Sequence, residues 1–184
     1  MIGPFVSLLI AMLLAGFVHL VTVLALPWLA PRDGYVRLTG LARENRMVMI
    51  PADEVMRTLP FADPAEAMAV CAYNLERGPV RIRLATGPAP VSLSFLRKGA
   101  GIYQSLSDRA ATQGVLDAVV VTPAQMEKIQ SLDSDDEPVQ EIRVVSSDEH
   151  GLVLVRGLVP VASQRGEIER VLAASTCEAE LLSP

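Results

Sequence analysis

Cys71 and Cys177 carry the only thiols in this chain of 184 residues. Two cysteines either stay reduced, packed as small apolar side chains, or join in a disulfide. A disulfide here would close a loop of roughly 105 residues, for which chain entropy predicts about 4–5 kcal/mol of stabilisation. It would also require an oxidising compartment. We expect the disulfide, and the reduced, buried pair is the alternative.

Side chains that carry out catalysis are sparse in the rest of the chain. The only histidines, His19 and His150, are far apart, and no Cys-x-x-Cys, His-x-His or His-Glu-x-x-His motif is present. No glycine pattern matches a phosphate-binding loop or a dinucleotide fingerprint. A serine hydrolase would have to use His150, and no Gly-x-Ser-x-Gly supplies its nucleophile. We therefore assign no catalytic, cofactor-binding or metal-binding residue and expect no cofactor.

A small-ligand module would need a concave pocket with a few convergent polar groups. The candidates for such a polar pocket are Tyr73, Ser94, Tyr103 and Asp108, of which the first three fall in predicted strands. For Asp108 the alternative is a turn in which it forms a surface ion pair with Arg109.

The composition excludes several classes of protein. With 51% hydrophobic and 20% charged residues, the chain is not a disordered tail. Its net charge of −5 opposes nucleic-acid binding, which needs a basic face. One acidic run lacks the glycine and the distal glutamate of an EF-hand, so we expect a solvated loop at Asp133, Asp135, Asp136 and Glu137.

The N-terminal segment is apolar, and the first charged side chain is that of Arg32. At about 1.5 Å per residue, a helix over residues 5–26 spans roughly 33 Å, close to the hydrocarbon thickness of a bilayer. Pro27 and Trp28 suit the interfacial end of such a span. We expect residues 1–31 to form an uncleaved anchor that enters the lipid bilayer with residues 5–26.

A cleaved signal peptide is the rival interpretation of this segment. The absence of Lys or Arg before the apolar run opposes it, as does the length of the run. Pro31 also follows the best small-residue cleavage site. Within the span, a stripe with four-residue spacing predicts a helix–helix contact and a possible homo-oligomer through Ser7, Ala11, Ala15 and His19. The alternative is that alanine is simply common in such spans.

The remaining residues predict a β-rich domain. Strict alternation marks strands over residues 80–84 and 91–95, and Gly87-Pro88-Ala89-Pro90 between them predicts a hairpin turn. Residues 68–73 and 102–106 complete an expected antiparallel meander. Further strands are expected over residues 116–121, 142–145 and 152–159, the last inside the sheet because it is nearly all apolar. Thr122 and Pro123 predict the start of a short helix, and residues 163–174 a closing one.

The predicted fold class is therefore α+β and mostly β. A single N-terminal transmembrane helix is followed by an antiparallel, sandwich-like domain with a closing C-terminal helix. We expect an anchor over residues 1–31, a juxtamembrane linker and lead-in over 32–62, and the β-rich domain over 63–184.

Several segments resemble the short, membrane-anchored branch of the DUF1254 family of bacterial proteins. They are DPAEAMAVCAYNL from residue 63, GPVRIR from residue 78, SLSF from residue 92 and IYQSLSDR from residue 102, with LAPRD from residue 29. The resemblance implies a mostly β domain and frequent association with DUF1214 domains, in the same chain or encoded nearby. It implies no established reaction. Longer members carry a Tyr-Asp or similar pair where this chain has Leu96-Arg97, and no catalytic residue is carried over.

The function we expect is that of a single-pass inner-membrane protein without established activity, whose periplasmic domain binds a DUF1214-type partner. The alternatives are a periplasmic small-ligand module and a subunit of an enzyme completed by its partner. Four arginines after the span favour a cytoplasmic domain by the positive-inside rule: Arg32, Arg37, Arg43 and Arg46. The cysteine pair and the family resemblance favour the periplasm, and the cytoplasm is the alternative.

Overall fold

The first element is a long apolar helix, α1 (Pro4–Leu29). The computed structural model describes residues 3–29, 34–133 and 141–180. Within α1, Pro4–Leu26 is long and apolar enough to cross a membrane, a property that signal sequences share. The side chains along this stretch are exposed, except that of Ala25, which is half-buried. The helix predicted over residues 5–26 is confirmed.

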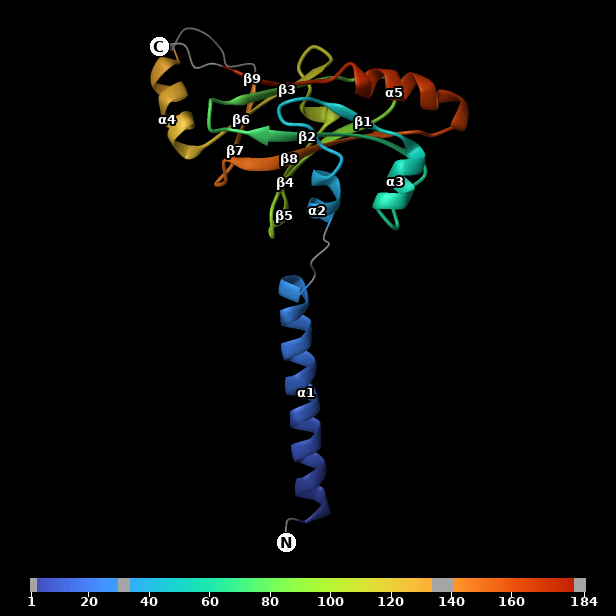
Figure 1. Cartoon of the computed structure of the whole chain (residues 1–184), viewed down its shortest axis with the longest axis vertical. Helices are drawn as coiled ribbons and strands as arrows, with labels where there is room; N and C mark the ends of the chain where they lie inside the picture. Colours follow the sequence, from blue (N-terminus) through green and yellow to red (C-terminus); the bar gives the residue numbers. More distant parts are fainter. Residues whose placement is uncertain (1–2, 30–33, 134–140, 181–184) are drawn as a thin grey trace. The chain divides into compact units, whose positions relative to one another are not determined.

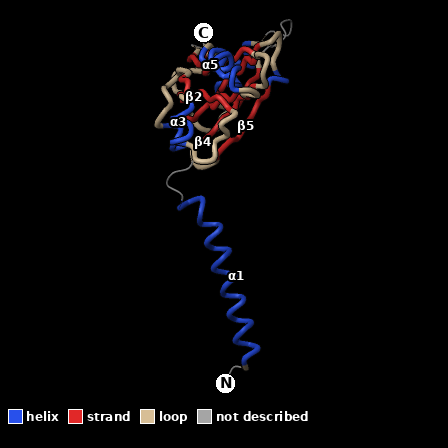
Figure 2. The backbone as a smooth tube through the Cα atoms, turned by 90° about the vertical axis from the view of Figure 1, so that its right-hand side faces the viewer, coloured by secondary structure: helices blue, strands red, loops and turns tan. Residues whose placement is uncertain are grey.

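Residues 34–184 form a second unit, built on two β-sheets (Figures 1 and 2). The larger sheet has the order β1-β2-β8-β4-β5, and all its neighbouring strands are antiparallel. Its strands are β1 (Val48–Ile50), β2 (Glu66–Asn74), β4 (Val91–Arg97), β5 (Gly101–Ser107) and β8 (His150–Leu158). The central strand is the nearly all-apolar β8, as predicted.

The smaller sheet has the order β7-β6-β3-β9. Its strands are β3 (Val80–Ala85), β6 (Val115–Val121), β7 (Ile142–Val145) and β9 (Thr176–Ala179). β6 and β7 pair in parallel, and the crossover connection that parallel pairing requires contains the helix α4 (Pro123–Leu132). A capping box starts α4: the Thr122 hydroxyl accepts from the Gln125 backbone N–H, and the Gln125 side chain accepts from the Thr122 N–H.

Helices cover the larger sheet in two places. The facing surfaces of the two sheets share one core, which Ile168 and Leu172 of α5 (Arg165–Ala173) also enter. The opposite surface of the larger sheet packs against Leu38 of α2 (Gly34–Thr39) and Val55 of α3 (Ala52–Thr58). Two short 3₁₀ turns complete the description, η1 (Asp108–Ala110) and η2 (Ala162–Gln164).

The meander predicted from the sequence is wrong. Strands β3 and β4 lie in different sheets, so the Gly87–Pro90 turn crosses between the sheets instead of closing a hairpin. Only β4 and β5 pair as successive strands of that expected meander. The segment expected as a linker and lead-in supplies the helices α2 and α3, which pack onto the larger sheet, and β1, an outer strand of that sheet. Three members of the acidic run, Asp135, Asp136 and Glu137, lie outside the described residues.

Candidate functional site

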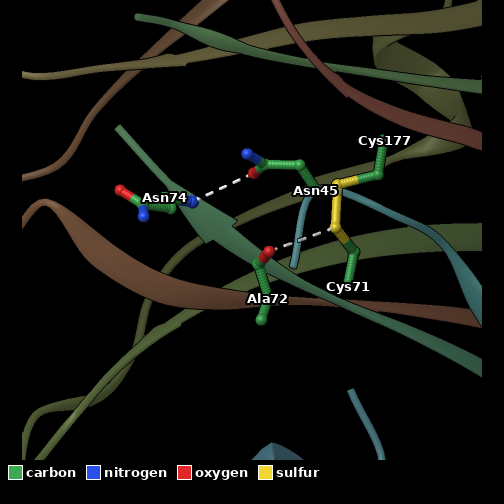
Figure 3. Close-up of a disulfide and its surroundings, with 5 residues drawn as sticks. All are labelled: Asn45, Cys71, Ala72, Asn74 and Cys177. Atoms are coloured by element: carbon green, nitrogen blue, oxygen red, sulfur yellow. Dashed lines mark hydrogen bonds between the residues drawn. A yellow bond between two sulfur atoms is a disulfide. The ribbon is translucent and has the colours of Figure 1, made fainter. Parts of the chain in front are cut away.

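A disulfide joins the two sheets through their shared core (Figure 3). It connects Cys71 of β2 with Cys177 of β9, whose Cα atoms are 6.6 Å apart, and both side chains are buried. Beside it, the Asn45 side-chain oxygen accepts from the Asn74 backbone N–H at 3.0 Å. Cys177 lies in β9, a strand that the sequence analysis missed, because its four residues, TCEA, contain one buried side chain and form no apolar run.

The second feature is a row of hydroxyl groups at one end of the core. The Tyr73 hydroxyl lies 3.2 Å from that of Tyr103 and 3.1 Å from the hydroxyl oxygen of Ser146. Tyr73 comes from β2, Tyr103 from β5, and Ser146 follows β7. Tyr103 reaches the core because a bulge makes it the extra residue of β5, between the partners of Phe95 and Leu96.

The direction of each hydrogen bond in this row follows from counting protons. The Ser146 hydroxyl donates its proton to the carbonyl oxygen of Asp148, at 2.7 Å. Ser146 must then accept from Tyr73, and Tyr73 must accept from Tyr103, because each hydroxyl has one proton. The row therefore runs in one direction, from the half-buried Tyr103 to the backbone of Asp148.

Burial determines the ionisation of both phenols. It raises the pKa of Tyr73 and of Tyr103 above the ordinary value of a tyrosine. Both groups therefore keep their protons at neutral pH, and they act here as hydrogen-bond donors. A general base at this place would need a phenol whose pKa is lowered.

Arg97 covers the outer end of the hydroxyl row. Its guanidinium carbon lies 4.9 Å from the centre of the Tyr103 ring, a cation–π contact. The same group donates to the Ser147 hydroxyl and lies 3.5 Å from the Asp148 carboxylate. Beside it is an open depression of about 660 Å³, lined by Tyr35, Lys98, Ser147, Asp148, Glu149 and His150. The depression has both signs of charge, and His150 lies 3.8 Å from the Glu76 carboxylate.

The pocket expected from the sequence is only partly assembled. Tyr73 and Tyr103 meet, but Ser94 faces the opposite surface of the larger sheet, opposite Leu154 of β8. There its hydroxyl lies 3.0 Å from that of Ser105 and accepts from Arg156 at 3.3 Å. Asp108 begins η1, and in the described part of the chain its carboxylate bonds none of the other three residues. These four residues therefore do not form one pocket.

Sequence reasoning missed Ser146, Arg97 and Gly151 as members of this site. Gly151 pairs directly with Tyr73, and its lack of a side chain leaves room for the phenol. Neither Ser146 nor Arg97 belongs to a motif, so only the pairing of distant strands brings them together. The one available signal was the polar turn of residues 146–151.

The outer face of the smaller sheet is covered by ion pairs. Arg81 pairs with the carboxylates of Asp117, Glu141 and Glu180. Arg143 donates a hydrogen bond from each of its two terminal nitrogens to the Asp133 carboxylate, at 2.5 and 2.7 Å. These hydrogen bonds lower the pKa of Asp133 and raise that of Arg143. This face is therefore suited to water.

The stripe predicted on α1 lies along one side of that helix. An open depression of about 600 Å³ is lined by Ala11, Leu14, Ala15, Val18, His19 and Thr22, and Ser7 lies one step of four earlier. Thr22 donates its hydroxyl proton to the Val18 carbonyl, at 2.8 Å, so that proton is used within the helix.

The edge of the larger sheet at β5 is unpaired in the described residues. β5 is seven residues long, whereas the other outer strands, β1, β7 and β9, have three or four. It contains no charged residue and no proline. Beyond the bulge, Gln104–Ser107 pairs regularly with β4 on one side.

Among the described residues, no group of three or more His, Cys, Asp or Glu side chains is placed to hold a metal ion.

No known protein family and no curated protein matches the chain. The chain is similar in structure to the VPA0106 protein of Vibrio parahaemolyticus, with a TM-score of 0.55 and 8% identity over 77% of this chain. An uncharacterised protein of Burkholderia cenocepacia has a TM-score of 0.46 and 10% identity over 63% of this chain. The chain covers 32% of each of these two proteins. The first likeness shows the fold alone.

Proposed function

We propose that this chain is a single-pass protein of the bacterial inner membrane whose periplasmic domain binds a partner protein along β5. The partner we propose is a DUF1214-type protein, on the resemblance of residues 63–109 to the DUF1254 family. The observation that carries the proposal is the long, uncharged edge of β5.

An unpaired strand edge presents a row of backbone N–H and C=O groups that can pair with another chain. Soluble proteins protect such edges with charges, prolines, short strands or bulges. β5 has one bulge, but it has no charge and no proline and is seven residues long. Its bulge limits regular pairing to Gln104–Ser107, where both the strand geometry and the uncharged side chains suit an added strand. A partner that supplies an extended segment there would extend the larger sheet.

The compartment in the proposal is supported by the buried disulfide, which an oxidising environment allows to persist. The length and composition of α1 support the anchor. A C-terminal alkaline phosphatase fusion tests the orientation, and we expect an active enzyme. An expressed but inactive fusion would place the domain in the cytoplasm, and a mature chain that begins near residue 31 would show that α1 is removed.

Copurification from detergent-solubilised membranes tests the binding. We expect the wild-type chain to retain a DUF1214-type protein, and the double variant Ile102→Lys, Gln104→Lys to lose it. Val161→Lys is the matched control, because Ile102 and Val161 are both 52% exposed and Val161 lies outside the strands. Retention of that partner by the β5 variant, or its absence from the wild-type sample, would contradict the proposal.

A small-ligand module is the second candidate, and the depression beside Arg97 favours it. Lys98 and His150 line this depression and supply donors for a small anion. Lys98→Ala would then abolish binding of the ligand and leave the β5 partner in place. If the β5 substitutions remove the protein partner and Lys98→Ala has no effect on any ligand, the result favours partner binding over the small-ligand module.

A further inference from the structure

The loop after α3 exposes the side chain of Phe61 at a backbone conformation that phenylalanine rarely adopts. The Leu59 carbonyl accepts from the Ala62 N–H at 3.1 Å, which closes a four-residue turn with Pro60 and Phe61 at its centre. Phe61 has a φ of 76°, in the left-handed region. Proline followed by a residue of positive φ is the pattern of a type II turn, in which the second central position normally holds glycine or asparagine.

The exposure of Phe61 is complete, at 102% of the reference value for its side chain. Its neighbours behave differently, since Leu59 and Ala62 pack against the core under α2 and α3. The turn is therefore fixed at its base, and its exposed tip consists of Pro60 and the phenyl ring of Phe61. Met56, on the last turn of α3, is also half-exposed. A strained residue that shows a whole aromatic ring to water points to a surface that the ring enters.

The place of this turn in the fold indicates which surface that is. Arg37 of α2 donates to the Thr58 carbonyl at 3.0 Å, three residues before Phe61. α2 is the first element of the domain after the apolar helix, and only residues 30–33 separate the two helices in the chain. The turn is thus attached to the element that follows the proposed membrane span directly.

We propose that the Pro60–Phe61 turn inserts the Phe61 ring into the interfacial region of the same lipid bilayer that α1 crosses. This inference rests on the part of the proposed function that makes α1 an uncleaved span. An aromatic ring suits the boundary between headgroups and acyl chains. The Asp63 carboxylate near the tip accepts from the Ala65 N–H, and its charge opposes anionic headgroups. The insertion is accordingly apolar and does not need anionic lipid.

Tryptophan fluorescence tests the insertion, because Trp28 is the only tryptophan of the chain. The full chain with Trp28→Phe and Phe61→Trp is placed in phosphatidylcholine vesicles, with or without bromine on the upper acyl carbons. We expect emission shifted to shorter wavelength and lost in brominated lipid. The control carries Trp28→Phe and Leu132→Trp, at an exposed position of α4, which Figure 1 shows on the other side of the domain from α3. Its emission should stay unquenched by the lipid.

Emission of the Phe61→Trp chain that aqueous iodide quenches, and brominated lipid does not, would overturn the proposal. Flotation of each chain with the vesicles is measured first and reports the anchor separately. A chain that floats without lipid quenching refutes the insertion and leaves the anchor standing. As a second measurement, Phe61→Ser in the wild-type background should increase the protease sensitivity of the 59–65 turn in vesicles but not in detergent. Equal sensitivity in both media would also count against insertion.

Discussion

Gly151 lies directly opposite Tyr73 in the pairing of β8 with β2, and a Cβ atom on Gly151 would stand 2.1 Å from the Tyr73 hydroxyl. The same Cβ would come within 2.7 Å of the Leu96 carbonyl, which belongs to the backbone. The phenol therefore lies over the backbone of β8 in a space that any side chain would fill. This close approach sets the position from which Tyr73 reaches Ser146.

Gly151→Ala should accordingly lower the free energy of unfolding by about 2–3 kcal/mol, since the clash involves backbone and cannot be relieved by one side chain. Denaturant unfolding of the detergent-solubilised chain measures the effect. Gly166→Ala is the matched control, because no atom lies within 4 Å of its Cβ position and alanine favours α5. Equal stability of the Gly151→Ala and wild-type chains would show that Tyr73 does not occupy this space.

The disulfide should contribute about 4–5 kcal/mol by the chain-entropy account, given the 106-residue separation of Cys71 and Cys177. Cys71→Ser, Cys177→Ser and the double variant should lower stability by similar amounts, because each removes the same crosslink. Thermal unfolding with and without reductant measures it. Thiol labelling of the denatured, unreduced protein should find no free cysteine, and two labelled thiols would refute the crosslink.

Relief of the strain at Phe61 should raise stability in detergent. Phe61→Gly should gain about 1 kcal/mol over Phe61→Ala, because glycine adopts a φ of 76° without the clash of a Cβ atom. Thermal unfolding of the two variants compares them at the same exposed position. Identical melting temperatures would show that the turn is not strained.

Acid should weaken the Asp133–Arg143 pair. The pKa of Asp133 is lowered in the folded protein, so the pair contributes its stability above the unfolded pKa of about 4. That contribution is lost as the pH falls through the folded pKa. Asp133→Asn should therefore flatten the acid side of the stability–pH profile and leave its alkaline side parallel to wild type. Because Asp133 is exposed, the effect should be small, and a larger one would point to a second carboxylate.

The stripe on α1 predicts self-association in a membrane. Ala11→Leu with Ala15→Leu would fill the depression along the helix and should weaken association in a membrane two-hybrid assay. Leu9→Met with Leu13→Met, on another side of the helix, is the control and should leave it unchanged. Association that survives the leucine substitutions would mean that the alanines reflect composition alone.

Local patterns in the sequence predicted most helices and strands, but they predicted few of the pairings between strands. The apolar run of β8 and the Thr122-Pro123 start of α4 are properties of single segments, and both are observed. The turn at residues 87–90 carries the residues of a hairpin, yet the inter-sheet core takes β3 and β4 into different sheets. Which sheet a strand joins depends on the burial of a whole face of that strand, and the residues of one turn do not determine it.

The candidate site was predictable only in part for the same reason. Tyr73 and Tyr103 belong to strands that alternation reveals, but the bulge that turns Tyr103 inward has no sequence signature. Ser94 lies in a correctly predicted strand and faces the other way, because its register against β8 assigns the faces. Ser146 follows the four-residue strand β7, and the parallel pairing of β7 with β6 is what brings Ser146 to the site.

The position of β8 between β2 and β4 has a consequence for the order in which the chain can fold. When the chain emerges N-terminus first, β2 and β4 appear before β8. β8, residues 150–158, is the strand that must pair with both of them. β9, with Cys177, follows later still and completes β3. The larger sheet therefore cannot be completed until β8 emerges, whereas the pairs β3–β6, β6–β7 and β4–β5 need neither β8 nor β9. A nascent chain stopped before residue 150 should therefore remain sensitive to protease in β2, and one released past residue 180 should become resistant there.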